Sequence, residues 1–167
     1  MSEPSRDIFD LVSTEFVSLQ TSFQRISLLL EPLINPALYM QRGVLLQALK
    51  PQPIDYAKVF VADAVPRAQR GYEQLWQQLP QVPFHPLHTQ LRLFLAWSQD
   101  FAQGESRAAP FPGGYKDIGA LLLPGLPWAA WELIETAEMD GLLFDGLVDL
   151  GDHFAWFPKP WRILATD

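Results

Sequence analysis

The residues best suited to chemistry are the acids of one segment, residues 132–152. This segment contains no Lys or Arg. Its seven carboxylates are those of Glu132, Glu135, Glu138, Asp140, Asp145, Asp149 and Asp152. Such a set could hold a hard cation or supply a carboxylate pair for acid–base catalysis. However, Asp140-Gly141 and Gly151-Asp152 are typical turn sequences, and the ligand spacing of an EF-hand is missing. We therefore favour an acidic, solvated rim and predict no metal site and no cofactor.

The three histidines offer few further ligands. His85 and His88 are three residues apart, and His153 is distant from both. His153 follows Asp152 directly, so it could act as a general base. A histidine in a predicted turn is more often a polar turn residue, and we favour that interpretation.

Aromatic and cationic residues concentrate near the C-terminus, where seven residues include Trp156, Phe157, Lys159, Trp161 and Arg162. A ring beside a cation suits an aromatic ligand, a sugar or an anion. Alternatively, the tryptophans of the C-terminal half build the core between sheet and helices. A third interpretation is that residues 157–161 form a rigid extended segment that docks a partner.

The turn Pro112-Gly113-Gly114-Tyr115 could present backbone N–H groups to an anion. It matches neither the P-loop nor the GxGxxG pattern, so we interpret it as a tight turn. The sequence has no GxSxG, HExxH, CxxC or kinase motif. Whether the protein is an enzyme is left open by the sequence.

Helices are predicted in the N-terminal half. One long helix is expected over residues 6–30, because apolar residues recur there at spacings of three and four: Val12, Phe16, Leu19, Phe23, Ile26 and Leu30. Asn35-Pro36 is typical of a helix start, and we expect that second helix to reach about residue 49. Asp63 is a candidate cap for a third helix. The inward face of this helix would be Val65, Ala68, Tyr72, Leu75 and Leu79.

Strands are predicted in the C-terminal half. Residues 90–97 alternate as in a strand, although a helical stripe is also possible, and a short helix is expected near Asp100. A short helix should cover 115–122. Gly151-Asp152 separates two strand-like runs, which predicts a hairpin of residues 142–150 and 153–157 that resumes at 161–164. Because a lone hairpin is barely stable, we assign residues 128–136 to a third strand despite their helix propensity.

Together these elements predict an α+β fold, in which a helical N-terminal half packs on a small antiparallel sheet. A mostly helical chain with one C-terminal hairpin is the alternative. The order of elements over Trp128–Leu164 is similar to that of the NTF2-like cone-shaped folds, which would imply a curved sheet closed by helices. We expect one domain, residues 1–167.

Composition limits the classes of function. The 167 residues include no cysteine and carry a formal net charge of -7. A disulfide scaffold, a thiolate nucleophile and Cys-ligated metal sites are therefore excluded. The acidity argues against nucleic acid as a partner. The start is acidic and every apolar run is short, so we expect neither a secretory signal nor a membrane span, and a cytoplasmic protein.

Two functions fit these observations. The first is a non-catalytic, immunity-, adaptor- or accessory-type protein that binds a protein partner, with a basic partner as one option. Its candidate contacts are Asp149, Asp152 and Trp161, and the N-terminal helix could instead serve self-association. The second is a small-molecule or enzymatic pocket between the helices and the sheet. Its candidate lining residues are Tyr115, Trp128, Glu132, Asp145, Trp156 and Arg162.

Overall fold

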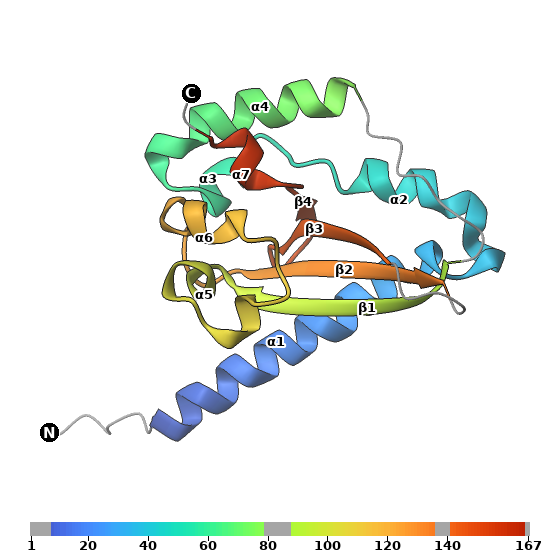
Figure 1. The fold of residues 1–167 in the computed structure, drawn as a ribbon, viewed down its shortest axis with the longest axis horizontal. Coiled ribbons are helices and arrows are strands. Elements are labelled where there is room, and N and C mark those ends of the chain that lie inside the picture. The colour runs from blue at the N-terminus through green and yellow to red at the C-terminus, as the bar shows by residue number, and fades with distance from the viewer. Residues whose placement is uncertain (1–7, 79–87, 136–140, 166–167) are drawn as a thin grey trace, which may run out of the picture.

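A four-stranded antiparallel sheet surrounded by helices forms the fold, which is an α+β architecture (Figure 1). The computed structural model describes residues 8–78, 88–135 and 141–165. The strands are adjacent in sequence order: β1 (His88–Trp97), β2 (Pro127–Glu135), β3 (Leu142–Asp149) and β4 (Phe154–Trp156). The α+β prediction is confirmed. The mostly helical alternative is wrong, because β1 and β2 add two long strands to the predicted hairpin.

The N-terminal helices follow the apolar spacing only in part. The long helix is confirmed as α1 (Ile8–Leu30). The predicted second helix is split into a 3-10 segment, Pro36–Gln41, and α2 (Arg42–Ala48). Asn35 caps the first of these, because its Oδ1 accepts a hydrogen bond from Ala37 N–H at 3.0 Å.

The third predicted helix is present, but its start differs. It is α4 (Val65–Gln77), preceded by α3 (Asp55–Val59), which the sequence did not reveal. The Asp63 cap is wrong: Ala64 precedes α4, and no side chain caps this end. Ala68 and Tyr72 of the predicted inward face are buried. Leu79 lies outside the described residues.

Short helices frame the strands in the C-terminal half. They are α5 (Ser98–Gln103), α6 (Gly114–Ile118) and α7 (Pro160–Ile163). The strand at 90–97 and the helix near Asp100 are confirmed, and the strand predicted over 128–136 is confirmed as far as Glu135, since residue 136 lies outside the described residues. The helix predicted over 115–122 is shorter, because α6 gives way to a 3-10 turn at Gly119–Leu121. The strand predicted over 161–164 is wrong. Lys159, with a φ of 48°, turns the chain, and Pro160 suits the first turn of a helix.

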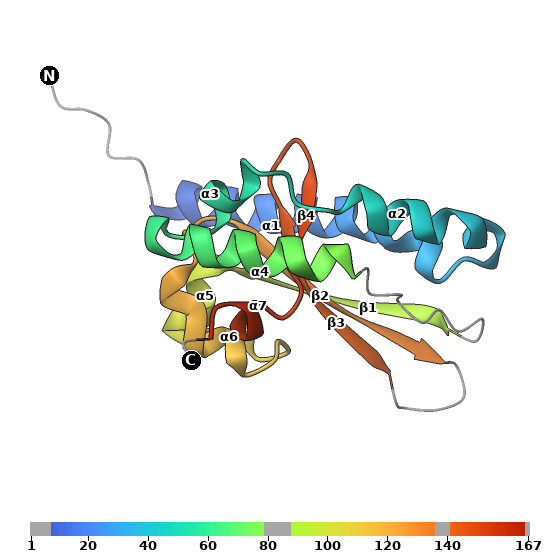
Figure 2. The ribbon, with the colours of Figure 1, turned by 90° about the horizontal axis from the view of Figure 1, so that it is seen from above.

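The two faces of the sheet are covered unequally (Figures 1 and 2). α1 packs behind the sheet, where Ile26 and Leu30 are almost completely buried. Of the described helices, α5, α6 and α7 lie over one end of the opposite face. None of the described helices lies over the other end of that face, toward Glu135 of β2, in either view.

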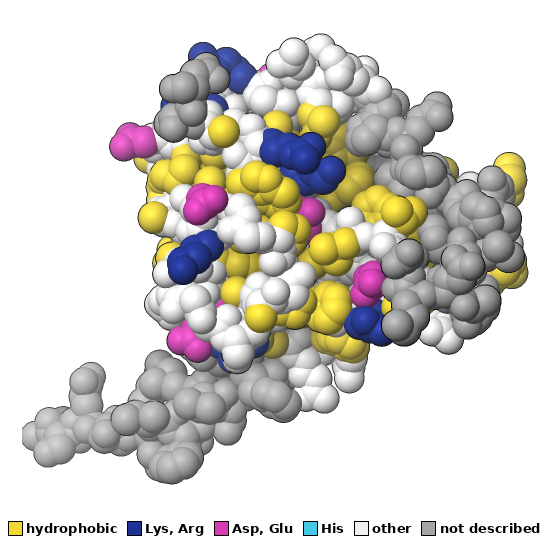
Figure 3. Space-filling model, viewed as in Figure 1, with side chains coloured by type: hydrophobic (Ala, Val, Ile, Leu, Met, Phe, Trp, Pro, Cys, Tyr) yellow, Lys and Arg dark blue, Asp and Glu magenta, His cyan; other side chains and the backbone are white. Residues whose placement is uncertain are grey.

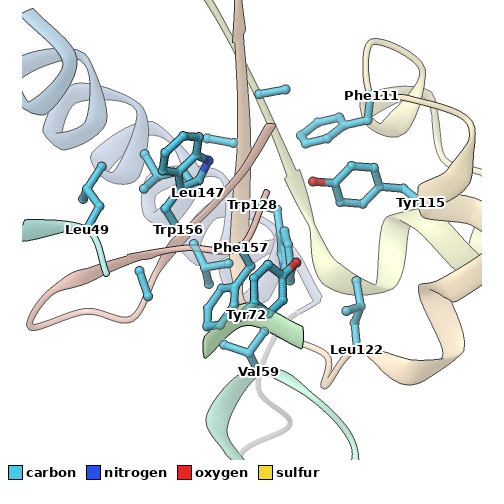
Figure 4. Packing of buried hydrophobic residues seen from close by; sticks show 14 of the residues in the cluster. Leu49, Val59, Tyr72, Phe111, Tyr115, Leu122, Trp128, Leu147, Trp156 and Phe157 are labelled. Atoms are coloured by element: carbon cyan, nitrogen blue, oxygen red, sulfur yellow. The ribbon is translucent and has the colours of Figure 1, made fainter. Parts of the chain in front are cut away.

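Aromatic rings fill the core between these layers (Figure 4). Tyr115 and Trp128 lie edge to face with their ring centroids 5.8 Å apart, and Tyr72 meets Phe157 in the same way at 5.3 Å. Trp128, Trp131 and Trp156 are all buried. The interpretation of the tryptophans as core is therefore confirmed for these three. No helix in the described residues is long and apolar enough to span a bilayer.

Candidate functional site

Asp145 is the centre of the residues that the sequence singled out for a ligand. It lies in β3, and its Oδ1 accepts hydrogen bonds from the Tyr115 hydroxyl at 2.8 Å and from Lys159 N–H at 2.9 Å. The Trp156 indole donates to the Asp145 carbonyl oxygen at 2.8 Å. Segments separated by 30 residues of sequence therefore meet at one carboxylate.

The backbone around Asp145 is unusual, and this positions the donors. A bulge interrupts the β2–β3 register beside it. The next residue, Gly146, has a φ of 90°, which favours glycine. The Gly146 carbonyl accepts a hydrogen bond from Phe157 N–H at 2.7 Å. This contact brings the chain back over β3, so that Lys159 N–H reaches Asp145.

Electrostatics at Asp145 are set chiefly by burial, which raises the pKa of its carboxyl above the ordinary value. The hydrogen bonds from Lys159 N–H and Tyr115 and the charges of Lys159 and Arg162 oppose this rise. Burial, together with the nearby Asp145 charge, also raises the pKa of Tyr115 well above its ordinary value. Tyr115 therefore remains a neutral donor throughout the physiological range.

One atom of Asp145 stays available. Its Oδ2 has no hydrogen-bond partner in the described residues, and it is not among the unpartnered polar atoms that are sealed from solvent. Lys159 and Arg162 are exposed, and neither side chain has a hydrogen-bond or ion-pair partner in the same part of the chain. Asp145 is thus a buried acceptor, 4% exposed, that lies close to the cations of Lys159 and Arg162.

Two cross-strand rows run from Asp145 toward the outer end of the sheet, and in the first of them Ala130 and Asp145 are buried. The register places Phe94, Ala130 and Asp145 in one row, and Arg92, Glu132 and Leu143 in the next. Residues directly opposite one another share a face of a sheet.

We call this surface, the rows Phe94–Ala130–Asp145 and Arg92–Glu132–Leu143, the open face. Leu143 is 44% exposed and Phe94 is half-buried. Arg92 pairs with Glu132 at 3.2 Å. Figure 3 shows apolar side chains gathered on this side of the molecule among acidic and basic ones.

The sequence-predicted ligand residues are only partly brought together. Tyr115, Asp145 and Arg162 share the site described above, and Glu132 lies in the adjacent row of the open face. Trp128 is completely buried, and Trp156 reaches Asp145 only through the backbone carbonyl. These two indoles are core residues that support the site from beneath.

The predicted partner contacts do not share a surface. Asp149 is buried, and it binds Ser22 Oγ at 2.7 Å and Arg25 at 2.8 Å, which fastens α1 to β3. Asp152 is exposed in the β3–β4 turn. Trp161 is half-buried, and its ring centroid lies 5.3 Å from that of Tyr115. The seven acids of the sequence therefore do not form one rim.

His153 binds two carboxylates at once. Its Nε2 lies 2.8 Å from Asp55 Oδ1 and its Nδ1 lies 2.7 Å from Asp152 Oδ1. Asp55 is fully buried and also accepts Gln52 N–H at 2.7 Å. A neutral imidazole has a single N–H, so both carboxylates are satisfied only by imidazolium. With both ring nitrogens engaged, His153 is a latch between the hairpin turn and α3 rather than a free base.

This latch predicts a pH-dependent stability. Partial burial lowers the pKa of His153, but the hydrogen bonds to Asp152 and Asp55 outweigh it and raise the pKa above 6.5. Stabilisation by the latch is therefore full below about pH 6.5 and is lost as pH rises through the folded-state pKa. We expect urea titrations from pH 5.5 to 8.5 to show this loss in the wild type and a smaller loss in His153→Gln. If the free energy of unfolding fell equally with pH in the two proteins, the latch would be contradicted.

Two hollows border these elements. One of about 480 Å³ lies between α1 and the β1 and β3 ends, and its walls include Arg25, Trp97 and Asp149. The other, of about 270 Å³, is lined by the Gly113 turn and by Tyr115. Among the described residues, no group of three or more acids and histidines is placed to hold a metal ion.

Several residues of the site escaped the sequence analysis. Phe94, Arg92 and Leu143 join the open face only through strand register. Lys159 belongs to the C-terminal cluster expected from the sequence, but its backbone N–H bond to Asp145 was not foreseen. The alternation of residues 90–97 was the one available signal, and it does not identify the partner strand. No known protein family, curated protein or solved structure matches the chain. The resemblance to NTF2-like folds therefore stays a prediction.

Proposed function

We propose that this protein is a non-catalytic binding protein that holds a protein partner on its open face. The observation that carries the proposal is the unequal covering of the sheet. The described helices lie over one face and over one end of the other, while Leu143, 44% exposed, and the half-buried Phe94 lie toward the end that none of these helices covers. Apolar residues on an uncovered sheet face are typical of an interaction surface.

The contacts of the titratable side chains also favour a binding protein over an enzyme. Both ring nitrogens of His153 are engaged, and Asp149 is held by Ser22 and Arg25. Of the acids discussed above, Asp145 alone combines deep burial with an available oxygen. His153 and Asp149 support the structure through contacts already made, and Asp145 is only 4% exposed, whereas a catalytic base would need a free, accessible atom.

Charge favours a basic partner. The chain as a whole carries a formal net charge of -7. An acidic surface speeds association with a basic protein, and this effect weakens as salt rises. The proposal therefore includes a marked salt dependence of the association rate.

The test compares two exposed leucine or valine positions. Leu143→Arg places a bulky cation on the open face, whereas Val44→Arg changes α2 at a residue that is 72% exposed. We expect a stoichiometric partner captured from native lysate at low salt to be lost with Leu143→Arg and retained with Val44→Arg. Purified partner and protein should then bind at least ten times more weakly with the first variant. A partner retained equally by both variants would refute the open face as its site.

A second candidate function is small-molecule binding at Asp145, and one observation favours it. Asp145 is 4% exposed, its Oδ2 has no hydrogen-bond partner in the described residues, it lies close to Lys159 and Arg162, and its carboxyl has a raised pKa. Perturbed carboxyls beside cations are enriched at ligand sites. In a fragment screen by NMR, some fragments should shift the backbone amide resonances of Tyr115 and Lys159 together in the wild type. The same fragments should leave these resonances unchanged in Asp145→Asn. Hits confined to other surfaces would exclude this candidate.

A further inference from the structure

A third hollow, of about 300 Å³, lies between α4 and the connection that leads from α2 to α3 (Figures 1 and 2). None of the residues named as the open face lines it. Its size is at the lower end of the range for small-molecule sites, so it suits a small ligand rather than a segment of another protein. The described residues that line it are Lys50, Pro51, Pro53, Tyr56, Glu73 and Gln77.

Tyr56 brings an unpaired hydroxyl to this hollow. The residue is 2% exposed, and its ring is held edge to face against Phe157 with the centroids 5.6 Å apart. Its hydroxyl has no hydrogen-bond partner in the described residues, and it is not among the unpartnered polar atoms that are sealed from solvent. Because Tyr56 is otherwise buried and lines the hollow, the hydroxyl faces the hollow. Polar groups of buried residues rarely lack a partner, and a bound ligand would supply one.

The state of this hydroxyl is fixed by its surroundings. Burial, assisted by the charges of Glu73 and Asp55, raises the pKa of Tyr56 to about 12. Tyr56 is therefore protonated throughout the physiological range and can donate a hydrogen bond into the hollow. A donor that shares a hollow with the cation of Lys50 suits a carboxylate.

Opposite charges line the same hollow without pairing with each other. The Lys50 ammonium has no hydrogen-bond or ion-pair partner in the described residues. Glu73 Oε1 accepts a hydrogen bond from the Gln69 amide at 3.0 Å, and Glu73 Oε2 has no partner in the same part of the chain. Unlike Arg92 and Glu132, which neutralise one another, Lys50 and Glu73 each remain available to a ligand.

The wall that carries Lys50 is held in place before any ligand binds. The Leu49 carbonyl accepts a hydrogen bond from Trp156 N–H at 2.9 Å, which ties this wall to β4. Gln52 N–H donates to Asp55 Oδ2 at 2.7 Å, and Asp55 N–H donates back to the Gln52 carbonyl at 2.9 Å. The prolines at positions 51 and 53 restrict the backbone further. A wall that is already ordered reduces the entropic cost of binding.

We propose that this hollow binds a free α-amino acid with an apolar side chain. The ligand's carboxylate would lie between Lys50 and the Tyr56 hydroxyl, and its ammonium group would meet Glu73. Its side chain would pack against Pro51 and Pro53. Glu73 would repel a simple carboxylate and Lys50 a simple amine, so only a zwitterion satisfies both charges. This inference does not depend on the proposed function, because the open face takes no part in it.

The first test uses the full chain and a panel of the twenty amino acids, followed by thermal unfolding and calorimetry. We expect leucine or another apolar amino acid to raise Tm, because a ligand of the native state stabilises it. The analogues 4-methylpentanoate and 3-methylbutylamine lack the ammonium group and the carboxylate of leucine, and each should bind at least about tenfold more weakly than leucine. Absence of binding by the whole panel, a preference for polar amino acids, or equal binding of either analogue would overturn the proposal.

The second test locates the site through two tyrosines. Tyr56→Phe removes only the unpaired hydroxyl, so the amino acid should bind at least about tenfold more weakly while the Tm of the free protein does not fall. Tyr72 is the matched control, because its hydroxyl donates to the Pro158 carbonyl at 3.1 Å and it does not line the hollow. Tyr72→Phe should lower Tm and keep the affinity. An affinity that is unchanged in Tyr56→Phe would refute this hollow as the site.

Charge variants complete the test. Lys50→Met and Glu73→Gln should each weaken binding of the amino acid at least about tenfold, whereas Lys116→Met and Glu105→Gln, which change exposed residues outside this hollow, should not. Equal affinities in all four variants would contradict recognition of a zwitterion. Leu143→Arg should leave this affinity unchanged, so failure of the amino-acid site and failure of the open face are read separately.

Discussion

Gly146→Ala is expected to destabilise the protein by roughly 3 kcal/mol or more, which is a large part of the stability of an ordinary domain. Gly146 has a φ of 90°, and a Cβ added there would overlap the backbone carbonyl of Phe157. A left-handed backbone costs an L-residue roughly 1–2 kcal/mol by itself. Removing the overlap also requires Phe157 to move, which breaks its hydrogen bond to Gly146 and withdraws Lys159 N–H from Asp145.

Two glycines provide matched controls for this prediction. Gly151 has a similar φ of 93°, but a Cβ there meets nothing within 4 Å, so Gly151→Ala should cost only about 1–2 kcal/mol. Gly113 has a φ of -60° and open space, and Gly113→Ala should be close to neutral. The free energies of unfolding of the three variants in urea separate the cost of a positive φ from the cost of the overlap with Phe157. A loss for Gly146→Ala no larger than that for Gly151→Ala would show that the Phe157 contact is unimportant.

Arg25→Ala is expected to cost about 3 kcal/mol, because it leaves a buried carboxylate without its cation. The Asp149 side chain is 3% exposed and Arg25 binds both of its oxygens, at 2.8 and 2.9 Å. Arg25 also donates to the Gly151 carbonyl at 2.9 Å and lies over the Phe154 ring at 4.7 Å. We expect a loss of stability in the lower part of the range that is usual for a broken buried ion pair, because Arg25 is itself 37% exposed.

The surface pair of Arg92 and Glu132 provides the control. Its side chains are 61% and 22% exposed, so Arg92→Ala should cost less than about 1 kcal/mol. A double-mutant cycle with Arg25→Ala and Asp149→Asn should give a coupling of at least about 1.5 kcal/mol, and the corresponding Arg92 and Glu132 cycle less than about 0.5 kcal/mol. Similar couplings in both cycles would mean that α1 does not depend on Asp149.

What the sequence by itself determined was local. The long N-terminal helix, the strand at 90–97 and the hairpin about Gly151 follow from apolar spacing and turn residues, which act over a few positions. The same rules erred where a single residue redirects the chain. Lys159, with its left-handed backbone, and Pro160 turned an expected strand into α7.

What only the tertiary structure decided was the role of each acid. Asp145, Asp149 and Asp152 are similar in sequence, yet one is a buried acceptor for Tyr115, one anchors α1 through Arg25, and one stays exposed beside His153. Their partners come from up to 127 residues away. Burial and pairing across such distances depend on which segments the sheet brings together. An acid's neighbours in sequence therefore do not determine its chemistry.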